Sequence, residues 1–147
     1  MEKQKKSVLV KTITTQKDED GKTEFSTESQ GTMFVKDGEY FVFYTEHDSD
    51  GEKMSDGRIT ILKDTVEIKR SGAYSSRFVF EEGKTKNSLY STPYGAMPAT
   101  LKTRKLISAV DNEGGKIILE YSMTVGGRSF DNRVVINITP LQDGKDM

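Results

Sequence analysis

Turn-forming residues divide this chain into short extended segments along its whole length. Asp37-Gly38 and Gly126-Gly127 are pairs typical of tight hairpin turns, because they accept the positive φ angles that such turns need. Between the turns, apolar and polar residues alternate with the period of two that places side chains on opposite faces of a strand. A chain of this pattern folds into antiparallel sheet.

The composition favours strands in the same way. Val, Ile and Thr number 34, whereas the helix formers Ala and Leu number 11. We expect no convincing helix and a single domain over residues 1–147. The expected strands span residues 7–16, 23–36, 39–46, 57–62, 65–70, 74–80, 84–92, 97–110, 116–125 and 128–139.

Strands in an open sheet leave two unpaired edges, which closure into a barrel removes. The short connections favour up-and-down order. The sequence therefore predicts an all-β, antiparallel, up-and-down barrel of about eight to ten strands, whose interior holds side chains or one small ligand. We expect a bend or bulge at Gly31, which interrupts a long extended run.

Alternation also assigns one face of each strand to the barrel interior. The residues expected inside are Tyr40, Val42, Tyr44, Glu46, Ile59, Ile61, Val66, Ile68, Arg70, Phe78, Phe80, Ile117, Leu119, Tyr121, Met123, Val134, Ile136 and Ile138. Their alternates are mostly polar, with Phe41, Phe43 and Val135 as exceptions. A strand that is apolar on both faces is covered on both, so we expect a packing or dimer contact outside the barrel there.

Arg70 is the most unusual member of the inward set, because a buried guanidinium is costly unless it is paired. One interpretation is an ion pair with Glu46, with Tyr hydroxyls as partners, that closes one end of a filled barrel. The other is that Arg70 and Tyr44 or Tyr121 hold the anionic head of a ligand, with Glu46 orienting Arg70. A single bulge would reverse the faces of a strand and change either interpretation.

Several short motifs occur in order along the chain. They are Tyr40-x-x-x-Tyr44-x-Glu46, Arg70-Ser71-Gly72, Tyr90-Ser91-Thr92-Pro93-Tyr94-Gly95 and, in a late strand, Tyr121. In this order and spacing the chain resembles the YwiB-like family of small bacterial proteins of unknown function. That family is similar in fold to the calycins, the superfamily of lipocalins and fatty-acid-binding proteins. The resemblance implies a calycin-like, lipocalin-like barrel and implies no particular ligand.

Several function classes are excluded or disfavoured. The chain has no Cys and a single His, His47, which excludes disulfides, Cys-ligated zinc and multi-His metal sites. We expect no cofactor, no metal and, since no catalytic constellation is present, no enzymatic activity. The formal net charge of −1 predicts no nucleic-acid partner, and the lack of a long apolar run predicts no membrane partner and a cytoplasmic protein.

We therefore expect a bacterial protein that binds a small anionic or amphipathic ligand inside its barrel. The alternative is an interaction module with a filled core, which forms a homodimer through the face of Phe41 and Phe43. The candidate ligand-binding residues are Arg70, Tyr44, Glu46, Tyr121, Tyr40, Tyr90, Thr92 and Tyr94. The last three form a Tyr-rich corner that would lie at a barrel mouth.

Overall fold

The computed structural model describes residues 4–48, 50–72 and 75–141. Its ten strands are β1 (Gln4–Asp18), β2 (Gly21–Lys36), β3 (Glu39–His47), β4 (Lys53–Ile61), β5 (Val66–Gly72), β6 (Ser75–Phe80), β7 (Thr85–Thr92), β8 (Gly95–Asp111), β9 (Gly114–Val125) and β10 (Arg128–Pro140). All ten expected strands are present, and several run longer than expected. Tyr74, which was expected to begin the sixth strand, lies outside the described residues.

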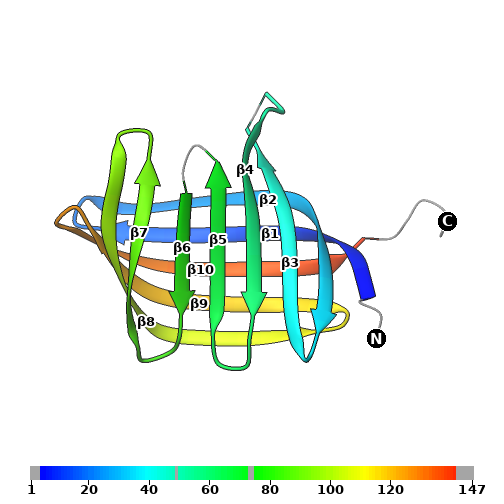
Figure 1. The fold of residues 1–147 in the computed structure, drawn as a ribbon. Coiled ribbons are helices and arrows are strands. Elements are labelled where there is room, and N and C mark those ends of the chain that lie inside the picture. The colour runs from blue at the N-terminus through cyan, green and yellow to red at the C-terminus, as the bar shows by residue number, and fades with distance from the viewer. Residues whose placement is uncertain (1–3, 49, 73–74, 142–147) are drawn as a thin grey trace.

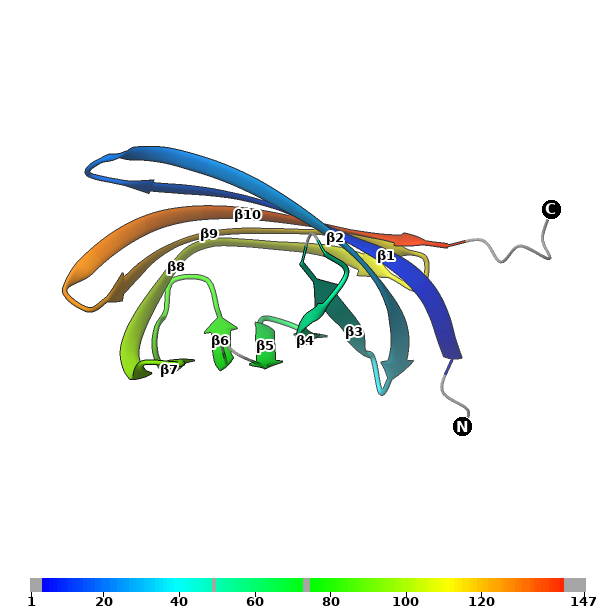
Figure 2. The ribbon, with the colours of Figure 1, turned by 90° about the horizontal axis from the view of Figure 1, so that it is seen from above.

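The strands form one closed antiparallel barrel in up-and-down order, as the sequence predicts. Each strand pairs with its neighbours in the chain, and β1 pairs with β10 to close the sheet. The barrel is flattened into two layers, with the shorter strands β3–β7 in front and the long strands of the other layer running across them (Figures 1 and 2). In the part of the chain that the structure describes, no helix has the length and apolarity needed to cross a membrane.

The long strand β2 passes from one layer to the other. It pairs with β1 over nearly its whole length but with β3 only from Gly31 to Lys36. Of the bend or bulge expected at Gly31, the bulge is wrong, because the pairing with β1 runs past this residue without a register shift. The strand as a whole is curved (Figure 2). Glycine is needed because a Cβ would collide with the carbonyl oxygen of Phe43 on β3.

Register shifts occur at two other places. One lies between Glu46 and His47, where β3 meets β4, and one between Thr103 and Lys105, where β8 meets β9. The second shift changes the inward face of β8 from odd-numbered to even-numbered residues, since Thr103 is buried and Leu106 packs on the core. Alternation alone therefore describes only half of β8.

The hydrophobic core lies inside the barrel. Its buried members are Val8, Val10, Met33, Val42, Tyr44, Ile59, Ile61, Val66, Ile68, Phe80, Leu101, Ile117, Leu119, Tyr121, Val134, Ile136 and Ile138. The faces predicted for β3, β4, β5, β9 and β10 are confirmed by this set. Glu67, an outward alternate on β5, forms ion pairs with Arg58 and Arg77 on the outer surface.

Candidate ligand site

One end of the barrel interior holds a cavity of about 570 Å³. It is lined by Thr12, Thr14, Phe25, Thr27, Glu46, Lys53, Met54, Ser55, Arg70 and Tyr90, which come from β1, β2, β3, β4, β5 and β7. Phe25 and Met54 contribute apolar side chains and are about half exposed, at 50% and 51%. Arg70 and Glu46 contribute charged groups to the same lining, so the cavity wall is amphipathic.

A row of neighbours across three strands positions Arg70. Tyr44 on β3 lies opposite Gly57 on β4, and Gly57 lies opposite Arg70 on β5. A Cβ on Gly57 would overlap the ring of Tyr44, so this ring lies over the position that a β4 side chain would occupy. Because Gly57 has no side chain, the tyrosine on one strand can approach the arginine two strands away.

Arg70 and Glu46 form the ion pair that the sequence predicts. The Arg70 Nε–H donates to Glu46 Oε1 at 3.2 Å, and the Ser55 hydroxyl donates to the same oxygen at 2.8 Å. The Arg70 side chain keeps 37% of its surface exposed, against 17% for Glu46. The carboxylate is therefore held from two sides, while the guanidinium borders the cavity.

The tyrosines beside Arg70 are protonated over the ordinary pH range. Burial raises the pKa of Tyr121 to about 12, although the Arg70 charge opposes the shift. Burial also raises the pKa of Tyr44, against the opposing effect of Arg70. Burial disfavours the Arg70 charge, but Tyr44, Glu46 and Tyr121 outweigh it and raise the pKa of Arg70. The site thus presents a permanent cation beside neutral hydroxyls.

Two buried polar side chains that sequence reasoning missed flank Tyr121 on the inner face. Thr103 on β8 and Asn132 on β10 both lie opposite Tyr121. Thr103 is 1% exposed and Asn132 4%, and among the described atoms Thr103 Oγ1 and Asn132 Nδ2 have no hydrogen-bond partner. Alternation from Val134 would have placed Asn132 inside, and alternation from Leu101 would have placed Thr103 inside, because the β8 register shift follows Thr103.

The structure brings five of the eight candidate residues to this end of the barrel: Arg70, Tyr44, Glu46, Tyr121 and Tyr90. Tyr90 borders the cavity, with its ring centroid 6.4 Å from that of Phe78.

Two other candidates lie elsewhere. Tyr40 faces inward but lies opposite Ile61, where β3 begins and β4 ends. It borders a separate hollow at the other rim of the barrel. Tyr94 is 97% exposed in the turn between β7 and β8. Thr92 pairs with Gly95, and its side chain lies outside the described part of the structure. The Tyr-rich corner thus contributes Tyr90 to the cavity wall, and Tyr94 is not among the lining residues.

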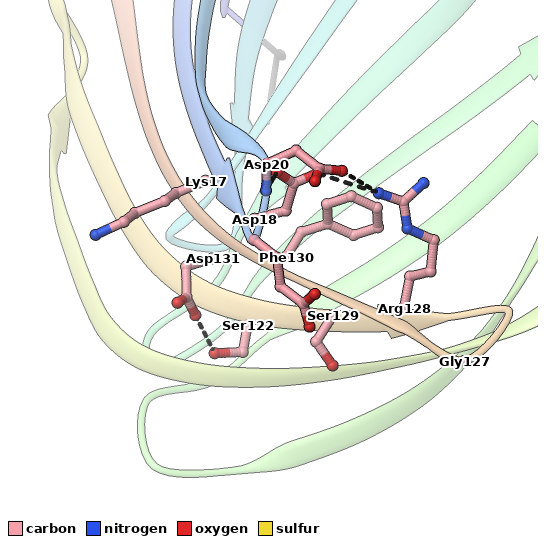
Figure 3. Close-up of a pocket in the computed structure, with 10 residues that line it drawn as sticks. Lys17, Asp18, Asp20, Ser122, Gly127, Arg128, Ser129, Phe130 and Asp131 are labelled. Atoms are coloured by element: carbon pink, nitrogen blue, oxygen red, sulfur yellow. Dashed lines mark hydrogen bonds and ion pairs between the residues drawn. The ribbon is translucent and has the colours of Figure 1, made fainter.

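A larger hollow of about 630 Å³ lies between the tips of the β1–β2 and β9–β10 hairpins (Figure 3). Its charged groups are largely engaged with one another. Arg128 Nη2 lies 3.3 Å from Asp18 Oδ2 and 3.7 Å from Asp20 Oδ2. The Ser122 hydroxyl donates to Asp131 and holds the pKa of that carboxyl below its ordinary value, with Arg104 acting in the same direction. The ion pairs of Arg128 with Asp18 and Asp20 thus link the two hairpins.

Acidic residues gather around that hollow without forming a metal site. Within residues 4–48, 50–72 and 75–141, no group of three or more His, Asp or Glu side chains is placed to hold a metal ion.

Phenylalanines stack on the outer surface of β2 and β3. The ring of Phe34 lies 5.1 Å from that of Phe41 and 5.5 Å from that of Phe43, in stacked geometry. Phe43 remains 42% exposed. The outward apolar face of β3 is thus partly covered by Phe34 from the same chain, which is the packing contact outside the barrel that the sequence offers as one of two expectations.

Comparison with known proteins supports the fold. A family model described as "Domain of unknown function (DUF1934)" matches residues 9–136. The chain is 29% identical to the uncharacterized β-barrel protein YwiB of Bacillus subtilis (strain 168) over 97 residues, which are 65% of this chain and 66% of that protein. The crystal structure of the Bacillus subtilis ywiB protein superposes with a TM-score of 0.83 at 20% identity, covering 94% of each chain.

Proposed function

Because the chain belongs to the DUF1934 family, whose description assigns no function, we propose a function from the site itself. The protein binds a small amphipathic ligand in the cavity of its barrel, without chemical conversion of that ligand. The anionic group of the ligand lies against Arg70, and its apolar part lies against Phe25 and Met54. The main support is the cavity of about 570 Å³ whose lining combines Arg70 with the exposed apolar residues Phe25 and Met54.

The guanidinium suits an anion in this position. It carries five N–H donors, of which Glu46 uses the one on Nε. The donors on the two terminal nitrogens are planar and suit two oxygens of a carboxylate, sulfonate or phosphate. Glu46, itself held by Ser55, fixes the orientation of Arg70. The protonated Tyr44 and Tyr121 add no competing negative charge.

The cavity volume suits a small molecule. Ligand pockets commonly measure about 300–1,000 Å³ and combine apolar walls with a few polar groups. Thr12, Thr14 and Thr27 add threonine residues to the lining beside the charged and apolar ones. A ligand with one charged end and a compact hydrocarbon part would contact all three kinds of surface.

The test uses 8-anilino-1-naphthalenesulfonate, an amphipathic sulfonate, and the neutral dye Nile red. We expect Arg70→Leu to weaken sulfonate binding by about 10–100-fold, because a charge-assisted hydrogen bond contributes roughly 1.5–3 kcal/mol. Binding of the neutral dye should change by less than about threefold, since the apolar wall remains. Fluorescence titration measures both, and far-ultraviolet circular dichroism checks that the variant is folded.

Glu46→Gln is the matched control, because it keeps the shape of the site and removes the competing anion. It should bind the sulfonate more tightly than the wild type, in the opposite direction to Arg70→Leu. Unchanged sulfonate binding by folded Arg70→Leu would show that Arg70 does not hold the anion. Native and denaturing mass spectra of freshly purified protein add an independent measurement, since a retained ligand gives a mass excess that denaturation removes.

The outer phenylalanine stack favours the second candidate function, a homodimeric interaction module. Phe43 is 42% exposed beside Phe34 and Phe41, and a second copy would cover it. A thiol introduced at Phe43 reports on this face in the crosslinking experiment below.

A further inference from the structure

One edge of β2 is left without a strand partner over ten residues. On its first edge β2 pairs with β1 from Gly21 onward, but on its second edge the pairing with β3 begins only at Gly31. Among the strands that the structure describes, none pairs with residues 21–30 along this second edge. Such an edge presents unpaired N–H and C=O groups and is a template for another strand.

The corresponding edge of β8, the other strand that passes between the layers, is capped by the chain itself. The Gly83 N–H donates to the Thr103 carbonyl, the Thr103 N–H donates to the Lys84 carbonyl, and the Leu106 N–H donates to the Glu82 carboxylate. The chain thus caps this β8 edge at Thr103 and Leu106, whereas the β2 edge has no partner among the described strands over residues 21–30.

We infer that the open edge of β2 pairs with the same edge of a second copy of this chain. In antiparallel pairing about a two-fold axis at Phe25, this residue lies opposite Phe25 of the second copy. Residues equally far before and after Phe25 lie opposite each other. Thr23 then lies opposite Thr27, and Lys22 lies opposite Glu28 of the second copy. Aromatic, threonine and opposite-charge pairs are the kinds that stabilise neighbouring strands.

Charge complementarity favours this register over the two adjacent ones. Moving the axis by one residue toward the turn places Glu24 opposite Glu24 of the second copy, and moving it one residue the other way places Glu24 opposite Glu28, twice. Like charges directly opposite each other destabilise strand pairs. Glu28 is free to turn toward a second copy, because its intramolecular ion pair with Lys11 measures 4.0 Å and is weak.

The pairing also accounts for Phe25. This ring is half exposed although it lies on the inward face of β2, where it borders the cavity. On the axis it would pack against Phe25 of the second copy, and the two cavities would open on the same side of one continuous sheet. The inference stands apart from the ligand proposal, since an empty cavity would leave the edge unchanged.

A single introduced thiol tests the register, because the natural chain has no cysteine. Antiparallel residues directly opposite have Cα atoms about 4.5–5.5 Å apart, within the disulfide range of about 4.4–6.8 Å. Phe25→Cys should therefore form a disulfide-linked species of twice the 16.5 kDa chain mass under mild oxidation. Phe43→Cys is the matched control, since Phe43 is similarly exposed, at 42% against 50%.

The expected result is disulfide formation at least about tenfold faster in Phe25→Cys than in Phe43→Cys at equal concentration, because an existing pair replaces random collision. Equal rates would overturn the inference. Faster linkage in Phe43→Cys would also overturn it and would favour the outer phenylalanine face.

Charge variants supply a second measurement that leaves Phe25 in place. Lys22→Glu and Glu28→Lys should each raise the dimer dissociation constant by about tenfold or more, because each places two like-charge pairs in the interface. The double variant Lys22→Glu/Glu28→Lys should restore the wild-type value. Sedimentation equilibrium measures all four proteins. A wild type that is monomeric at every concentration, or a double variant that does not recover, would contradict the inference.

Discussion

The two halves of the barrel interior differ sharply, although the same strands run through both. Along the inner face of β1, Val8 and Val10 give way to Thr12 and Thr14; along β5, Val66 and Ile68 give way to Arg70. We call the aliphatic region the packed half and the region around the cavity the cavity half. Because both strands become polar where they line the cavity, polar residues collect there rather than scattering through the core.

The difference shows how one chain combines a stable core with a binding surface. In the packed half, close packing of aliphatic side chains supplies stability. In the cavity half, the inward positions hold charged and hydroxyl groups, whose desolvation works against folding. The packed half therefore compensates for the cavity half, and substitutions in the two halves should have different consequences.

The largest expected effect is on the free energy of unfolding when a phenylalanine in each half is replaced by alanine. Phe80 is 1% exposed in the packed half, and Phe25 is 50% exposed at the cavity. Phe80→Ala should lower the free energy of unfolding by about 3–5 kcal/mol, since it removes buried surface and leaves a void. Phe25→Ala should lower it by less than about 1 kcal/mol. Urea unfolding measures both, and equal losses would contradict the division.

A smaller effect is expected at the boundary, where Tyr121 is buried and its pKa is raised to about 12. In the unfolded chain tyrosine titrates near pH 10, so between about pH 10 and 12 the unfolded state binds fewer protons than the folded state. The stability contribution is complete below about pH 10 and is lost as the pH rises through the folded pKa. The loss should reach about 2–3 kcal/mol.

Tyr121→Phe isolates this effect, because it removes the titrating hydroxyl and keeps the ring that packs 4.7 Å from Phe80. Urea unfolding at about pH 9 and pH 11.5 should show a shallower decline for the variant than for the wild type. Identical declines would mean that the Tyr121 hydroxyl is not in the low-polarity surroundings that the structure gives it.

Most of the fold could be predicted from the sequence, because period-two alternation specifies which face of a strand points inward. It does not specify the level along the barrel. Tyr40 and Tyr44 share the inward face of β3, yet Tyr44 lies beside the cavity end and Tyr40 toward the other rim. The Arg70–Glu46 pair could be predicted because few charged residues fall on inward positions, so each had an obvious partner.

The rest depended on contacts between strands. A register shift in β8 is invisible to alternation, so one inward face could not be assigned to the whole strand from the sequence. The curvature of β2 exposes its edge and brings Phe25 to the cavity, which only the pairing with β1 and β3 reveals. The role of Gly57 also depends on register, because the ring of Tyr44 on the next strand occupies the space that a side chain at this position would need.

The smallest expected effect tests that glycine. Gly57→Ala places a methyl group where the Tyr44 ring lies, and overpacking of this kind typically costs about 1–3 kcal/mol. We expect about 1–2 kcal/mol, toward the lower part of that range, because the ring borders the cavity half and can shift. In Tyr44→Ala the ring is absent, so adding Gly57→Ala to that variant should cost less than about 0.5 kcal/mol.

This double-mutant cycle sharpens the comparison of the two halves, because it asks whether Gly57 serves only to make room for Tyr44. Urea unfolding of the wild type, the two single variants and the double variant measures the coupling. If Gly57→Ala were as costly without the ring as with it, the glycine would be required by the β4 backbone instead. A coupling energy close to the full cost of Gly57→Ala alone would show that the missing side chain on β4 lets Tyr44 approach Arg70. The structure of the cavity half would then depend on that missing side chain as well as on its polar groups.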